Sequence, residues 1–245
     1  MSTSGRSTKD AETFLSALMA WRSAVLPKPL FREALASGGA TRNGFRTWVR
    51  EHFFSAYHFP RQIAALLARC EDEATFHEIS ANFSREAGWY ETPYHAELML
   101  PFGKAVGVSR EDFYAYQPTP QSLGLAYAVY HLSGSSVEEG IGAIAMAMEG
   151  IGSTLCTNDM ASGVVSGEKS TAELLEELYG FSPEATTFWR VHKGLQERDV
   201  NTGLGVVGRH LGSKAQRDRL ARAFRHATLL LAERDKVWAE LLVRP

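Results

Sequence analysis

Signals that begin a helix recur along the whole sequence, and they restrict the fold more than any other feature. A hydroxyl residue that precedes a proline, suited to the cap and first position of a helix, occurs at Thr92, Thr119 and Ser182. A serine that precedes an acidic residue by three positions, the pattern of a capping box, occurs at Ser109, Ser136 and Ser170. No segment shows the convincing alternation of a strand. The sequence therefore predicts an all-α protein.

Apolar residues recur at every third or fourth position between these starts, as they do on the buried face of a helix. We expect helices over residues 9–24, 28–37, 42–69, 72–87, 93–106, 110–116, 120–131, 137–158, 169–179, 183–210 and 213–242. No repeat of fixed period and no low-complexity linker divides the chain. We therefore expect a compact multi-helix bundle, with a disordered N-terminus over residues 1–8 and a single all-α domain over residues 9–245.

Composition narrows the classes of function. The chain has 245 residues, of which 44% are hydrophobic and 22% charged, which suits one domain with a substantial core. Its net charge of −2 argues against a nucleic-acid binder and against a polybasic membrane anchor. There is no run of about 18 apolar residues and no apolar leader, so we expect no membrane span. Two cysteines are too few for a disulfide framework, and we expect a cytoplasmic protein.

Glu149 stands alone in the apolar segment AIAMAMEGIG, residues 143–152. If this segment is an α-helix, with roughly 100° between successive residues, small side chains surround the glutamate: Gly142, Ala145, Gly152, Ser153 and Cys156. A buried carboxylate must be neutralised, ion-paired or bound to a metal. Three interpretations remain open: a solvent-exposed glutamate, a buried glutamate paired with Arg or His of another helix, and a ligand-binding glutamate in space that the small residues leave.

Two other places supply side chains that could bind a metal together with Glu149. Glu86 closes one expected helix, and His95 lies in the first turn of the next. His192 and Asp199 are seven positions apart and share one face of a later expected helix. Taken singly, each of these residues is as consistent with a solvent-exposed or capping position as with a metal site. Together they are the carboxylates and imidazoles with which helical bundles hold metal ions.

The order of these features resembles the haem-oxygenase-like superfamily, which includes TenA, the PqqC pyrroloquinoline-quinone synthases and non-haem iron oxidases such as CADD. The resemblance spans roughly residues 28–242 and rests on an acidic residue near a helix end, a histidine before ELMLPFGKAVG, a lone glutamate among small residues and the late segment FWRVH. It implies a helical fold around a central cavity, in which a small-molecule substrate, a metabolite or natural product, reacts with dioxygen. It also implies a homodimer.

The resemblance further implies an iron site. In the iron-containing members, a Glu, a His, a second Glu and a late His-x-x-x-Asp-x-x-His triplet hold two irons. The matching residues here are Glu86, His95, Glu149 and His192, with Asp199 as a further metal candidate. The triplet is incomplete in either alignment, because Gln196 or Thr202 replaces one ligand. We therefore expect an iron-dependent oxidase or oxygenase with a mononuclear or dinuclear site, and keep a metal-free site as the alternative.

Three other activities follow from the same resemblance. A PqqC-like oxidase without cofactor would use histidines and basic groups to bind and deprotonate the substrate, with His58, Arg61 and Arg209 as candidates besides His95 and His192. A TenA-like hydrolase would need an activated nucleophile, for which Cys156 is the candidate, although a cysteine among apolar residues more often only packs. A degenerate member would bind a small molecule without catalysis. Tyr57, Trp89, Tyr90 and Tyr94 would line the cavity or belong to the core.

Overall fold

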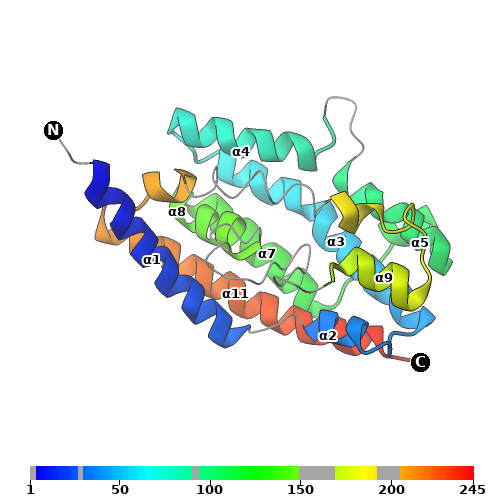
Figure 1. Cartoon of the computed structure of the whole chain (residues 1–245). Helices are drawn as coiled ribbons and strands as arrows, with labels where there is room; N and C mark the ends of the chain where they lie inside the picture. The colour runs from blue at the N-terminus through cyan, green and yellow to red at the C-terminus, as the bar shows by residue number, and fades with distance from the viewer. Residues whose placement is uncertain (1–3, 27–29, 90–93, 149–168, 192–204) are drawn as a thin grey trace.

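The computed structural model describes residues 4–26, 30–89, 94–148, 169–191 and 205–245, and these residues contain helices and no strand (Figure 1). The elements are α1 (Ser4–Val25), α2 (Leu30–Ala36), α3 (Arg42–Leu67), α4 (Glu73–Glu86), the 3-10 helix η1 (His95–Met99), α5 (Leu100–Val106), α6 (Arg110–Tyr114), α7 (Pro120–Ser135), α8 (Val137–Gly140), the π-helix η2 (Ile141–Met148), α9 (Thr171–Tyr179) and α11 (Lys214–Leu242). Residues 187–191 and 205–209 are also helical. The predicted all-α fold is confirmed.

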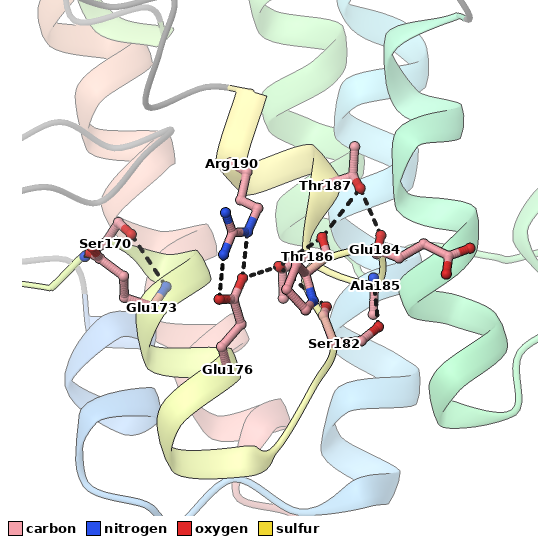
Figure 2. A network of polar contacts seen from close by, with 10 residues as sticks. Ser170, Glu173, Glu176, Ser182, Glu184, Ala185, Thr186, Thr187 and Arg190 are labelled. Carbon is pink, nitrogen blue, oxygen red and sulfur yellow. Dashed lines mark hydrogen bonds and ion pairs between the residues drawn. The ribbon is translucent and has the colours of Figure 1, made fainter.

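Helix caps agree closely with the sequence. Ser109 and Ser170 each form a complete capping box, the latter with Glu173 (Figure 2), and Thr119 caps α7 by accepting a hydrogen bond from the Ser122 backbone N–H. The first helix begins at Ser4, earlier than residue 9, where the sequence led us to expect its start. Among the described helices, none combines the length and the apolar character that a membrane crossing requires.

The apolar segment before Glu149 differs from the expected α-helix. Residues Ile141–Met148 form a π-helix, so the α-helical spacing that placed Gly142 and Ala145 beside Glu149 does not hold there. Gly142 also packs against α11: a Cβ added to it would lie 2.4 Å from the backbone oxygen of Leu220. This glycine therefore permits a close helix contact and does not leave room for a ligand. Glu149 itself lies outside the described residues.

Two clusters of buried side chains form the core. The first lies where α3, α7, η2 and α11 meet, and α1 packs against it, with Ile63, Val129 and Phe224 among its fully buried members. The second is rich in aromatic rings and joins α2, α3, η1, α5 and α9 to the C-terminal part of α11, with Trp48 and Trp189 stacked at its centre. Figure 1 shows α11 running along most of the molecule, beside both regions.

A buried carboxylate joins α3 to α7. Glu51 of α3 has no exposed surface, and it accepts hydrogen bonds from the Tyr116 hydroxyl at 2.7 Å and from the Thr119 backbone N–H at 2.7 Å. The Thr119 hydroxyl at 3.0 Å and the Ser122 hydroxyl complete its set of donors. A negative charge is favourable at this position, because the N-terminus of a helix carries a partial positive charge. Glu51 therefore fixes where α7 begins relative to α3.

Replacing Gly142 by alanine should destabilise the protein by about 2 kcal/mol, because the added methyl group meets the α11 backbone rather than a flexible side chain. The matched control is Gly124→Ala in α7, where a Cβ would meet nothing within 4 Å. That change should leave stability equal or raise it by about 0.5–1 kcal/mol, since alanine favours helix more than glycine. Urea unfolding followed by circular dichroism gives the free energy of unfolding of both variants. Equal changes in the Gly142 and Gly124 variants would contradict a close contact between Gly142 and α11.

Replacing Glu51 by alanine should lower the free energy of unfolding by about 3 kcal/mol or more, because several buried donors lose their acceptor at once. Glu73→Ala serves as the control, since the Glu73 side chain is 90% exposed. Its effect should stay within about 0.5 kcal/mol. Chemical denaturation measures both variants, and a Glu51 variant as stable as the control would show that this carboxylate does not hold α7.

Candidate functional site

Glu86 and His95 come together at the junction between α4 and η1. Glu86 is the last residue of α4, and Gly88 follows with a φ of +71°, a left-handed conformation that turns the chain away from the helix axis. His95 opens η1. The His95 Nδ1 atom lies 3.9 Å from a Glu86 carboxylate oxygen, and the two side chains are only 7% and 12% exposed. The sequence prediction that these two residues share a site is thus consistent with their position.

Burial distinguishes this pair from a similar pair on the surface. Glu73 and His77, one turn apart at the start of α4, have a comparable separation of 3.8 Å between imidazole nitrogen and carboxylate oxygen. Their side chains, however, are 90% and 75% exposed. Water screens the surface pair, whereas a buried carboxylate beside an imidazole carries a desolvation cost that a bound cation would offset.

Aromatic rings form the wall beside His95. The Phe188 ring, from the helical residues 187–191, lies edge-on to His95 with centroids 5.2 Å apart. On its other side Phe188 meets His52 of α3 at 5.0 Å, and His52 also lies 5.0 Å from Trp238 of α11. Phe188 precedes His192, the predicted metal ligand, by four positions in the sequence.

His52 is a candidate site residue that the sequence analysis missed. It is half-buried although its neighbours Trp48, Trp189 and Trp238 are at most 2% exposed. In the sequence, its position four residues after Trp48 indicates the side of α3 that faces the core. A histidine at such a position is a polar group within an aromatic wall, able to hydrogen-bond a ligand.

Arg61 lies on the exposed part of α3 and contacts two tyrosines. Its guanidinium donates to the Tyr57 backbone oxygen at 2.8 Å and lies 4.6 Å from the centre of the Tyr57 ring. The Tyr94 hydroxyl, 3.5 Å from Arg61, donates to the same Tyr57 oxygen at 2.5 Å. Burial raises the pKa of Tyr94, and the Glu86 carboxylate acts in the same direction. Tyr94 thus contacts the exposed Arg61 and is influenced by the charge of the buried Glu86.

His58 lies one turn of α3 before Arg61, with its ring 4.5 Å from that of Phe54. Burial lowers the pKa of His58 below its ordinary value, and the positive charge of Arg61 lowers it further. The imidazole is therefore neutral at pH 7 and able to accept a proton.

Arg209 and Cys70 lie near the start of α4, where each has partners other than Glu86 and His95. Arg209 pairs with Glu78 at 2.8 Å and with Asp72 at 3.3 Å, and donates to the Thr75 hydroxyl, so it holds the start of α4. This pairing removes the reason to expect Arg209 at a substrate. Burial raises the pKa of the Cys70 thiol, which disfavours the reactive thiolate.

Four predicted site residues, Glu149, Cys156, His192 and Asp199, lie outside the described residues. Within the described part of the chain, no group of three or more His, Cys, Asp or Glu side chains is arranged to hold a metal ion. Glu86 and His95 are thus two potential ligands of a site whose other predicted ligands remain predictions.

The chain is similar to a known protein family and to several characterised proteins. The model of the TENA/THI-4/PQQC family matches residues 29–149. The chain is 26% identical over 186 residues to a 4-chloro-allylglycine synthase from Streptantibioticus cattleyicolor, covering 71% of this chain and 66% of that protein. It is 25% identical to a pyrroloquinoline-quinone synthase from Rhizobium meliloti over 86% of this chain and 76% of that one. A 4-aminobenzoate synthase from Chlamydia muridarum is 23% identical, with coverages of 79% and 75%.

Solved structures show the same fold. A protein domain of unknown function with a haem-oxygenase-like fold from Shewanella denitrificans superposes with a TM-score of 0.70 at 15% identity, over 91% of this chain and 89% of that one. A CADD-like protein of unknown function from Nostoc punctiforme superposes with a TM-score of 0.67, also at 15% identity, over 97% and 98%. Residues 29–149 therefore match the TENA/THI-4/PQQC family, and the chain has a haem-oxygenase-like fold.

Proposed function

We propose that this protein is a non-haem iron oxidase or oxygenase that uses dioxygen to oxidise a small molecule. The buried pair of Glu86 and His95, 3.9 Å apart, is the observation that carries the proposal. The similarity to a 4-chloro-allylglycine synthase, a 4-aminobenzoate synthase and pyrroloquinoline-quinone synthases supports a biosynthetic reaction on a metabolite or natural product.

The donor atoms fit a metal ion. Bonds of about 2 Å from a metal to nitrogen or oxygen allow two ligands of one ion to lie up to about 4 Å apart. The separation between the His95 nitrogen and the Glu86 oxygen falls within that limit. One imidazole and one carboxylate are the ligand types that suit iron(II), with Glu149, His192 and Asp199 as the proposed further ligands. A bound iron would supply the activation of dioxygen.

The chain's own residues have separate tasks in this proposal. Glu86 at the end of α4 and His95 at the start of η1 hold the ion, so its position is set by where these two elements approach each other. Phe188 covers His95 from one side and keeps water away from that face of the site. His52, behind Phe188, offers a hydrogen bond to a polar group of the substrate within a wall of indole rings.

Replacing Glu86 or His95 by alanine should weaken iron(II) binding at least about 10-fold, because each removes a ligand. The matched controls are Glu73→Ala and His77→Ala, which remove the same residue types from the exposed pair. These should leave affinity unchanged. Anaerobic iron titration followed by elemental analysis measures the bound metal, and a thermal melt of the metal-free variants checks that they fold.

Equal iron content in the buried and exposed variants would refute a metal site at Glu86 and His95. If the wild type and all the variants bind no iron, the metal-dependent activity is excluded. Oxygen uptake by chelator-treated protein with catechol or quinol probes then decides between a metal-free oxidase and a protein that binds a small molecule without catalysis.

The metal-free, PqqC-like oxidase is a second candidate, favoured by the environment of His58. A general base must be unprotonated to accept a proton, and the lowered pKa of His58 favours its neutral form. The adjacent Arg61 could bind a negatively charged substrate group. The proposed TenA-like hydrolysis through Cys156 has no supporting observation among the described residues.

Replacing Arg61 by glutamine should raise the pKa of His58 toward its usual value, because the neighbouring positive charge no longer opposes protonation. Burial is the larger cause of the lowered pKa, so only part of the shift should be lost. Arg225→Gln is the control, since Arg225 lies over Trp21 on another part of the molecule. NMR titration of the histidine ring signals measures the pKa of His58 in both variants. A fall in this pKa on replacing Arg61 would contradict the placement of the Arg61 charge beside His58.

A further inference from the structure

Arg234 of α11 is a charged side chain inside the protein, beside the core cluster that contains Trp48, Trp189 and Trp238. Only 7% of its surface is exposed, and its guanidinium carbon lies 4.0 Å from the centre of the Trp238 ring. A guanidinium over a ring contacts it through its flat face, so this contact uses none of its N–H donors. Burial lowers the pKa of Arg234 to about 10, so the side chain remains positively charged at neutral pH.

The hydrogen-bond donors of Arg234 lack acceptors in the part of the chain that the structure describes. The Nε atom is buried without a hydrogen-bond partner, and no described residue forms an ion pair with the guanidinium. Buried donors without an acceptor are rare in native proteins, because each has lost its hydrogen bonds to water and gained none in return. A charged donor in this condition points to an acceptor that comes from outside the chain.

Two carboxylates near Arg234 are engaged by other groups. Those of Asp235 and Glu51 both favour the charged form of Arg234. Asp235, however, accepts a hydrogen bond from the backbone N–H of Leu30, the first residue of α2, and Glu51 is satisfied by the donors that begin α7. Each carboxylate thus offsets the partial positive charge of a helix start. Neither hydrogen-bonds to the guanidinium.

The indole ring beneath Arg234 is held in place. The Nε1 atom of Trp238 donates to the Ser122 hydroxyl at 3.3 Å, and that hydroxyl donates to Glu51. The contacts that fix the start of α7 therefore also fix the ring on which the guanidinium rests. A guanidinium on a fixed support keeps its donors oriented for a ligand, which lowers the entropy cost of binding.

We propose that Arg234 binds the carboxylate of the substrate, a small carboxylic acid with an apolar body. A guanidinium can donate two parallel hydrogen bonds to a carboxylate, the strongest form of this contact. The nearby carboxylates of Asp235 and Glu51 favour a ligand group with one negative charge over a phosphate, which carries about two. That the ligand is the substrate rests on the proposed oxidase function, whereas the binding of a carboxylate at Arg234 does not.

A row of rings connects Arg234 with the candidate metal site. Trp238, under the guanidinium, lies 5.0 Å from His52. Phe188 lies 5.0 Å from His52 on one side and 5.2 Å from His95 on the other. A ligand held by its carboxylate at Arg234 can extend its apolar body along these rings. The substrate would then be fixed at one end and present its other end toward His95.

Calorimetric titration of the full chain tests the proposal, with phenylacetate and hexanoate as probes and their neutral amides for comparison. A chelator is present, so that the acids cannot bind through a metal. We expect at least one acid to bind at least about 10-fold more tightly than its amide. Arg234→Met should weaken binding of that acid by about 10- to 100-fold, because it removes charged hydrogen bonds, and leave binding of the amide unchanged.

Arg225→Met is the matched control. It removes an exposed arginine of the same helix, which lies 5.9 Å from the Trp21 ring, and should change binding of neither acid nor amide. Arg234→Lys keeps the test valid if the methionine variant folds poorly. Lysine retains the charge but not the paired donors, so it too should bind the acid more weakly than the wild type does.

Thermal melts of the same variants separate a binding role from a structural one. An arginine that serves the fold should lower the melting temperature when it is removed. An arginine buried without hydrogen-bond acceptors should leave that temperature unchanged or raise it when methionine replaces it. We expect the second result for Arg234→Met, together with the loss of acid binding.

Four results would each overturn the proposal: no binding of either acid by the wild type, equal affinity for acid and amide, undiminished acid binding in the Arg234 variants, or a lower melting temperature of Arg234→Met. The first three would leave a buried water molecule as the partner of the guanidinium. Because the titration is done without metal, its failure leaves the iron-binding test unaffected, and a failed iron titration leaves this one unaffected.

Discussion

The buried carboxylate of Glu51 is the interaction on which the arrangement of the central helices depends. It sits on α3 without exposed surface and is satisfied by donors from the segment that starts α7. A charge in that position is tolerated only because all of these donors converge on it. Since His52 follows Glu51 directly, the same contact that places α7 also directs the next residue of α3 toward Phe188 and Trp238.

The candidate site combines parts that are close in sequence with parts that are distant. Glu86 ends α4 and His95 opens η1 nine positions later, so the two residues are close in sequence as well as in space. Phe188 and His52 come from other helices and line the site; they are not among its proposed metal ligands. Arg61 and His58 lie toward the surface of α3, with Tyr94 as the link to the interior. The proposed iron-based activity and the alternative metal-free activity would thus use residues on different sides of one junction.

Local sequence signals predicted the helices well because a cap involves residues only three positions apart, as at Ser109 and Ser170. Glu86 and His95 could be chosen as candidates from a glutamate that ends one helix and a histidine that opens the next, together with the family resemblance, whereas their burial could not be predicted. The burial of Glu51 could not, because its partner Tyr116 comes 65 positions later. The π-helix was missed as well, since the contact of Gly142 with α11 is tertiary and leaves no periodic pattern in the sequence.

The π-helix over Ile141–Met148 also has a consequence for how this family can diverge. A π-helix closes its hydrogen bonds over one residue more than an α-helix does. Loss of one residue from this uncharged stretch would restore α-helical geometry and rotate the chain that leaves Met148 by about 100°. A single deletion would thus redirect the following segment without substituting any candidate ligand.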